Sequence, residues 1–225
     1  MRDQLVAGDL LPPEHMMLEE YGIGRGTLRE ALRLLEFEGV IALKPGPKGG
    51  PVLLTPDASY LASSLVLLMQ LQKSPFRNIV EVRTGLEPVM SRLAAQRISG
   101  EALKELDETI QKMEENLDDQ EIFFESNRRF HDIIAWSSDN PLFGYIVDAL
   151  LGIVNGTDVG IEAPSSSRKA TLKSHKDIYE AIANRDPKLA EEKMREHLQA
   201  YIDYAERKYP DVLDRVIPWD RTLNR

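Results

Sequence analysis

The sequence contains no cysteine. Disulfide bonds, thiolate nucleophiles and cysteine-ligated zinc sites are therefore excluded, and a metal site in this chain has to use histidine and oxygen ligands. The lack of cysteine also suits a cytoplasmic protein, which is the location that we expect. Histidine is scarce as well, with four in 225 residues, so a histidine site can draw on only a few positions.

Long apolar runs are missing too. No run approaches the roughly 18 residues that a membrane-spanning helix needs, and the first ten residues are too polar for a signal peptide, so we expect no membrane association. Enzyme signatures such as H-E-x-x-H, a phosphate loop, a nucleophile elbow or a dinucleotide fingerprint do not occur. The sequence therefore does not predict an enzyme.

The net charge of -9 argues at first against a polyanionic partner. Near the start of the chain, however, Arg25, Arg29 and Arg33 recur every four residues on one helical stripe, and Lys44 and Lys48 flank a Pro/Gly turn. A phosphate backbone responds to charge within a Debye length of about 10 Å, so a local basic stripe can still form a nucleic-acid surface. The alternative is a solvated helix face whose arginines pair with neighbouring glutamates.

The order of elements in the first segment is typical of a winged helix-turn-helix. Residues 12–22 read as a short helix ended by a glycine, and residues 24–38 read as an amphipathic helix with arginines opposite its apolar face. Two short apolar runs, 40–43 and 51–54, surround a glycine-rich loop and predict a hairpin. In such a fold the second helix enters the major groove and the hairpin reaches the adjacent backbone.

Helical periodicity dominates the remainder of the chain. The expected helices are about 57–73, 75–98, 100–116, 119–137, 141–156, 166–184 and 187–208, with helix starts marked at Asp118, Asn140-Pro141 and Asp186-Pro187. The sequence therefore predicts a mainly α fold, in which an N-terminal winged helix-turn-helix at residues 1–56 precedes an all-α antiparallel bundle of six or seven helices at residues 57–225.

The stretch "LPPEHMMLEEYGIGRGTLREALRLLEFEGVIALKPGPKGG" resembles the DNA-binding domain of the GntR family of bacterial transcription regulators. The resemblance implies DNA contacts from His15, Arg25, Thr27, Arg29, Lys48 and Gly49. Two glycines, Gly24 and Gly26, stand where relatives often carry polar residues, which removes two side-chain phosphate contacts but lets backbone N–H groups approach a phosphate closely. Relatives also carry a longer first helix, so either the start is trimmed in this chain or that helix is only about two turns long.

Three histidines fall in the predicted bundle. His175 and His197 each lie 11 residues from Asp186 in a predicted helical hairpin, which puts them at the same height, roughly 16 Å from the loop. With His131 on a neighbouring helix they could converge on one cation. The alternative is three separate histidines, each satisfied by a local hydrogen bond.

Two segments, "NRRFHDIIAWSSDNPLF" and "SHKDIYEAIANRDPKLAEEKMREHL", resemble the FCD effector domain of FadR-type regulators. The resemblance implies a divalent metal, Zn²⁺ or Ni²⁺, bound by Asn127, His131, His175 and His197. Metal-binding relatives have an acidic residue where this chain has Asn127, and an amide oxygen is a weaker ligand than a carboxylate.

The same resemblance implies that Arg83, in "EVRTGLEP", faces the effector cavity and binds a small organic acid. A salt bridge from Arg83 to Glu87 is the alternative. Together the motifs predict a ligand-responsive bacterial transcription regulator, a repressor, that binds double-stranded operator DNA as a homodimer. A metal or metabolite sensor whose N-terminal head binds a protein is the other function that the pattern allows.

Overall fold

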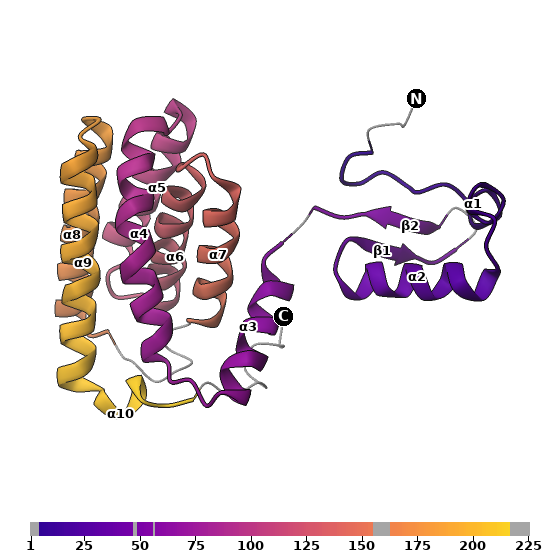
Figure 1. Cartoon of the computed structure of the whole chain (residues 1–225). Helices are drawn as coiled ribbons and strands as arrows, with labels where there is room; N and C mark the ends of the chain where they lie inside the picture. The colour runs from indigo at the N-terminus through magenta and orange to yellow at the C-terminus, as the bar shows by residue number, and fades with distance from the viewer. Residues whose placement is uncertain (1–4, 47–48, 56, 155–162, 217–225) are drawn as a thin grey trace. The chain divides into compact units, whose positions relative to one another are not determined.

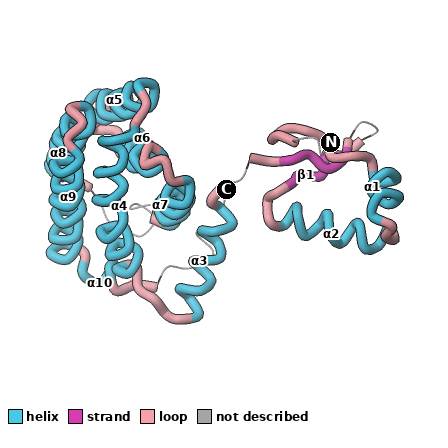
Figure 2. The backbone as a smooth tube through the Cα atoms, turned by 45° about the horizontal axis from the view of Figure 1, so that its top comes forward, coloured by secondary structure: helices cyan, strands magenta, loops and turns pink. Residues whose placement is uncertain are grey.

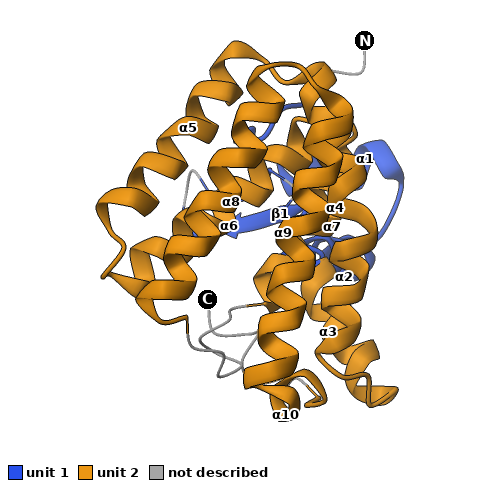
Figure 3. Cartoon of the chain, turned by 90° about the vertical axis from the view of Figure 1, so that its left-hand side faces the viewer, with its two compact units in different colours: residues 1–60 blue, residues 61–225 orange. Residues whose placement is uncertain are grey.

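A computed structural model describes residues 5–46, 49–55, 57–154 and 163–216. The chain forms two compact units, Met1–Tyr60 and Leu61–Arg225 (Figure 3). The division falls four residues beyond the position at which the sequence placed the domain boundary, inside the first helix of the second segment.

The first unit contains helices α1 (Glu14–Tyr21) and α2 (Arg25–Phe37), followed by strands β1 (Ile41–Lys44) and β2 (Gly50–Leu53). Helix α1 ends at a residue in the left-handed conformation, Gly22, with φ of 61°. The strands are antiparallel, with Ile41 opposite Leu53 and Lys44 opposite Gly50. One buried side chain from each element, Met17, Leu28, Ile41 and Val52, supplies the small core. Figure 2 shows the hairpin following α2, as a winged helix-turn-helix requires.

A two-turn helix before residue 12, one of the two alternatives that the sequence left open, is absent from the described residues 5–13. Asp9 accepts a hydrogen bond from the backbone N–H of Val6 at 2.9 Å and so closes a turn. The following residues then run beside β2, where the Leu11 N–H donates to the Pro51 carbonyl at 2.8 Å and Leu10 forms a bridge to Val52. Backbone donors that a helix would use are thus committed to the sheet.

The second unit is helical in the part that the structure describes (Figure 1). Its helices are α3 (Ser59–Leu71), α4 (Arg77–Arg97), α5 (Gly100–Glu115), α6 (Gln120–Trp136), α7 (Pro141–Ile153), α8 (Ser165–Ala183), α9 (Pro187–Lys208) and the short α10 (Pro210–Leu213). Helix α4 is central, because it packs against α6, α7, α8 and α9. None of the described helices is long and apolar enough to cross a membrane.

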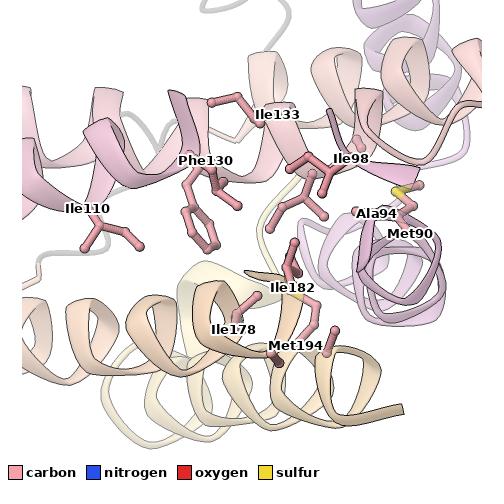
Figure 4. Close-up of a cluster of buried hydrophobic side chains, with 14 of the residues drawn as sticks. Met90, Ala94, Ile98, Ile110, Phe130, Ile133, Ile178, Ile182 and Met194 are labelled. Carbon is pink, nitrogen blue, oxygen red and sulfur yellow. The ribbon is translucent and has the colours of Figure 1, made fainter. Parts of the chain in front are cut away.

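The core of this unit lies between α4, α5, α6, α8 and α9. Figure 4 shows Phe130 of α6 directed towards Ile178 and Ile182 of α8 and Met194 of α9, all of them buried. Complete burial of an aliphatic or aromatic side chain contributes about 1.5–3 kcal/mol, so this cluster fixes how the three helices stand against each other. The positions of His131, one residue after Phe130, and of the other bundle histidines follow from that packing.

Helix caps confirm two of the three predicted helix starts. The side chains of Asn140 and Asp186 accept hydrogen bonds from backbone N–H groups in the first turns of α7 and α9. The predicted cap of α6 at Asp118 is wrong by one residue, because Asp119 accepts from the Ile122 N–H at 3.1 Å.

Candidate functional site

The first turn of α2 presents the predicted DNA contacts to solvent. Arg25, Thr27 and Arg29 are exposed, while Leu28 between them is buried and anchors the helix. Arg29 has only a loose ion pair, with its Nε 3.6 Å from Oε1 of Glu14 at an exposed position. Such pairs contribute less than about 1 kcal/mol, so this guanidinium is available to another anion.

In the alternative, the arginines of α2 form ion pairs with glutamates of the same helix. Among the described residues, Arg33 is the only one of the three that does so. Arg33 pairs with Glu30 at 3.2 Å, two turns further along α2. Glu36 instead accepts a hydrogen bond from the backbone N–H of Leu43 and so ties α2 to β1. The positive charge at the N-terminal end of α2 therefore has no strong internal partner among the described residues.

Gly24 and Gly26 are not required by the fold itself. Neither has a positive φ, and a Cβ at either position would meet no atom within 4 Å. Gly24 is the N-cap of α2 and offers no side chain to the free N–H groups of the first turn. Both glycines leave those N–H groups open to an approaching phosphate.

Three further DNA contacts were predicted, at His15, Lys48 and Gly49. Gly49 has a structural reason to be glycine, because a Cβ there would lie 2.1 Å from the carbonyl oxygen of Lys44. Lys48 is outside the described residues. His15 is exposed on α1. None of these positions is tested by the structure alone, and all remain predictions.

The second candidate site is a cluster of three imidazoles inside the helical unit. His131 comes from α6, His175 from α8 and His197 from α9, and one ring nitrogen of each lies within 4.8 Å of the other two. The Nε2 atoms of His131 and His197 are 3.3 Å apart. His131 and His175 are buried and His197 is partly buried. The three rings face one another, so they form one cluster and not three separate sites.

His175 is the least satisfied member of the cluster. Neither its Nδ1 nor its Nε2 has a hydrogen-bond partner among the described residues. One face of its ring stacks on Phe130, with centroids 3.9 Å apart and planes 9° from parallel. A buried polar group without a partner costs about 1–3 kcal/mol, so a lone pair here has a strong preference for a ligand.

A buried ion pair borders the cluster on the α4 side. Glu87 binds Nε of Arg83 through Oε1 at 2.5 Å and faces Nδ1 of His131 through Oε2 at 2.6 Å. Arg83 therefore makes the salt bridge that the sequence offered as the alternative to an effector contact. Glu87 was not identified as a site residue from the sequence. Its i, i+4 spacing from Arg83 was visible, but its contact with His131 crosses 44 positions.

Burial keeps two of the three imidazoles, those of His175 and His197, in the neutral form. Burial is the main reason that the pKa of His175 lies well below 6.5, and the nearby His197, His131 and Arg83 lower it further. Burial and His131 likewise bring the pKa of His197 to about 3. Burial alone would raise the pKa of Glu87, but the charge of Arg83 and the hydrogen bond to His131 outweigh it and hold the carboxyl ionised. His175 and His197 are therefore neutral at pH 7, as metal ligands must be.

Comparison with known protein families identifies both parts of the chain. The model of the bacterial regulatory proteins of the gntR family matches residues 1–47, and the FCD domain model matches residues 78–200. The chain belongs to the GntR family. The family predicted from the sequence is thereby confirmed, together with a winged helix-turn-helix followed by a helical FCD domain. Proteins of these families are transcriptional regulators and not enzymes.

Individual relatives agree with this assignment. A Bacillus subtilis protein described as an uncharacterized HTH-type transcriptional regulator, YcbG, is 34% identical over 87% of this GntR chain and 80% of its own length. The galactonate operon transcriptional repressor of Escherichia coli is 28% identical over 83% of each chain. A solved Streptococcus agalactiae GntR structure has the same fold, with a TM-score of 0.67 at 22% identity over 87% of this chain and 90% of that one.

The donor set of this GntR protein fits a divalent transition ion. Imidazole nitrogens that bind tetrahedral zinc at 2.0–2.1 Å lie about 3.3 Å from each other, which is the separation between His131 and His197. His175, with both nitrogens unpartnered, supplies a third donor. Asn127 is partly buried one turn before His131 on α6, and no described contact links it to the cluster, so its role as a ligand stays a prediction.

The cluster predicts a pH dependence of folding in ion-free protein. The unfolded chain has ordinary histidines with a pKa near 6.5, whereas His175 and His197 bind protons only at lower pH in the folded chain. Below about pH 6.5 the unfolded state therefore holds more protons, and stability is lost as the pH falls. We expect the two histidines to lower the free energy of unfolding by about 2 kcal/mol between pH 7 and 5.5.

Urea unfolding in the presence of a chelator measures this effect. The range from pH 7 to 5.5 lies above the range in which carboxyl groups titrate, so the histidines dominate the change. A variant with His175→Phe, which keeps a flat ring against Phe130, should show about half of the decrease. Equal stability of the unaltered protein at pH 7 and 5.5 would show that these imidazoles are not buried as described.

Proposed function

We propose that this protein is a ligand-responsive repressor in which the helical unit binds a small carboxylate through a divalent ion, and in which the winged head binds operator DNA. The observation that carries the effector half is the inward-facing histidine cluster with the unpartnered nitrogens of His175. Its residues would hold Zn²⁺ or Ni²⁺, both of which favour imidazole ligands. When bound, such an ion acts as a Lewis acid that attracts an anion to its open positions.

Charge balance supports a carboxylate as the effector. Three neutral imidazoles leave the two positive charges of the ion uncompensated, and no described carboxylate joins them as a ligand. The nearest acidic group, Glu87, is already committed to Arg83 and His131. An anionic metabolite would therefore complete the site. One relative is named for a galactonate operon, and galactonate is a carboxylate.

Arg83 remains the proposed second anchor for that carboxylate. Its Nε is bound to Glu87, which fixes the guanidinium beside the histidines, and a guanidinium carries four further N–H donors. An effector carboxylate could use those donors without breaking the pair with Glu87. Arg83 would then recognise the anion, while Glu87 orients the arginine.

The DNA-binding half rests on the exposed start of α2. Arg25 and Arg29 carry charge that no strong internal partner uses, and Gly24 opens the helix end to a phosphate. These features favour DNA over a protein partner for the head. Phosphate neutralisation predicts a steep loss of affinity with added salt, which a protein partner would not require. Such a protein works in the bacterial cytoplasm, where its operator lies.

A homodimer follows from the same proposal, because two heads are needed for a two-fold symmetric operator. Support comes from α3, a strongly apolar helix on which Leu61, Leu67, Leu68 and Leu71 are exposed. A second copy of the chain is the occupant that would cover this face.

A thermal-shift screen of organic acids, run with Zn²⁺ and with a chelator, tests the effector half. We expect at least one small carboxylate to raise the melting temperature with Zn²⁺ present and to lose that effect with the chelator. An acid at 100 times its dissociation constant stabilises the folded state by about 2.7 kcal/mol, which is several degrees for a chain of this size. Equal shifts with and without chelator would remove the ion from the proposal.

A further inference from the structure

We propose that Glu87 is a positioning residue for the metal site, which holds His131 in the tautomer that carries its proton on Nδ1 and so directs the Nε2 lone pair at the ion. The inference rests on the proposed metal site. It assigns a role to a residue on α4, a helix that contributes none of the three imidazoles.

The tautomer follows from what each group can do in a hydrogen bond. An ionised carboxylate has no proton to donate, so the ring nitrogen 2.6 Å from Oε2 of Glu87 has to be the donor. That nitrogen is Nδ1 of His131. A neutral imidazole then has its only lone pair on Nε2, which is the atom that faces His197. Carboxylate–histidine pairs of this kind fix the ring and increase its basicity towards a metal.

The position of Glu87 is itself fixed from two sides. Its other oxygen is held by Nε of Arg83 one turn earlier on α4, so both carboxylate oxygens are engaged. Arg83 and Glu87 are both buried, where the dielectric is low and a charged hydrogen bond is strong. Packing of α4 against α6 brings the carboxylate to His131. His131 therefore cannot rotate without breaking a buried charged network.

A further consequence concerns His197. In the ion-free protein, Nε2 of His131 is an acceptor, so the nitrogen of His197 at 3.3 Å has to donate a proton to it. With its Nε2 as a ligand, His197 would have to give up that proton, and the neutral ring would then carry its proton on Nδ1. Metal binding should therefore change the tautomer of His197 and leave that of His131 unchanged.

Long-range ¹⁵N–¹H spectra of the histidine side chains test this assignment in the full chain without any metal. A His131→Gln variant identifies the signals of His131. We expect His131 as the Nδ1–H tautomer in the ion-free protein and, after addition of Zn²⁺, a change of tautomer in His197 while His131 keeps its proton on Nδ1. A proton on Nε2 of His131 in the ion-free protein would overturn the proposal, whatever the protein does with zinc.

The second measurement is the affinity for Zn²⁺, determined by competition with a chelating indicator. Glu87→Gln should weaken zinc binding by 10- to 100-fold, the range typical of partners that orient a metal-bound histidine. Because that variant leaves Arg83 buried without a counter-charge, a paired variant with Arg83→Gln and Glu87→Gln removes both charges together. Glu191→Gln is the matched control. Glu191 lies on α9 and pairs with Arg92 of α4 and with Arg195 of α9, so this variant should bind zinc normally.

The outcomes separate this inference from the proposed function. Zinc binding that is unchanged in the paired variant would show that Glu87 has no positioning role, although the metal site itself would stand. No zinc binding by the unaltered protein would refute the metal site and this inference together. A 10- to 100-fold loss in the paired variant, with a mixture of His131 tautomers, would establish the role of Glu87.

Discussion

Arg29→Ala is expected to lower the affinity for operator DNA by 10- to 100-fold without lowering the melting temperature. The side chain is exposed in the first turn of α2, and its ion pair with Glu14 is long and solvated, so the folded state loses little when it is removed. A guanidinium that binds a base edge or a phosphate is worth about 1–3 kcal/mol, which corresponds to this range of affinities.

Gel retardation with a duplex selected from a random library by the unaltered protein measures this loss. Arg195→Ala is the charge-matched control, because Arg195 is an exposed arginine on α9 that pairs with Glu191. If Arg29 contacts a phosphate, the variant should also have a shallower dependence of log affinity on log salt, by about one unit. Equal retardation by the Arg29 variant and the control would contradict the assignment of α2 as the recognition helix.

His175→Phe is expected to abolish stabilisation by Zn²⁺. The substitution keeps an aromatic ring against Phe130 but removes both nitrogens, one of which would bind the ion. The unaltered protein should gain about 2.7 kcal/mol at a zinc concentration 100 times the dissociation constant, and the variant should gain nothing measurable. In chelator the variant should be at least as stable as the unaltered protein, because it no longer buries two unpaired polar atoms.

Differential scanning calorimetry with Zn²⁺ and with chelator gives both numbers. His15→Ala removes an exposed histidine of the first unit and serves as the control, with the full zinc response retained. A zinc-dependent increase in melting temperature that survives in the His175 variant would place the ion elsewhere.

The fold was largely predictable because local signals mark it. The spacing of apolar residues predicted the helices of the second unit to within a few residues. The helix caps at Asn140 and Asp186 were predictable because each depends on a side chain and the backbone of the turn that follows it. The errors occurred where two local signals compete. Asp118 and Asp119 are both acceptable caps, and in the structure the side chain of Asp119 caps α6. Helix α10 carries too few residues for periodicity to reveal it.

The histidine cluster was partly predictable for a geometric reason. His175 and His197 flank one hairpin at equal distances, so helix rise alone places them at the same height. Convergence with His131 was only one of two alternatives, because nothing local links α6 to that hairpin, and the resemblance to the FCD domain favoured it. The role of Glu87 could not be found from the sequence, since it depends on a hydrogen bond between α4 and α6. The structure was needed to show that the fold does not require glycine at the two positions that begin α2, because a Cβ at either would meet no atom within 4 Å.

The central claim is that occupation of the histidine cluster controls the winged head. The most direct measurement is the operator dissociation constant of the unaltered protein with Zn²⁺, taken with and without the carboxylate that the thermal-shift screen identifies. An allosteric coupling of 1–3 kcal/mol predicts a change of about 5- to 150-fold, lost in the His175→Phe variant. Operator affinity that is the same with and without that acid would contradict the account.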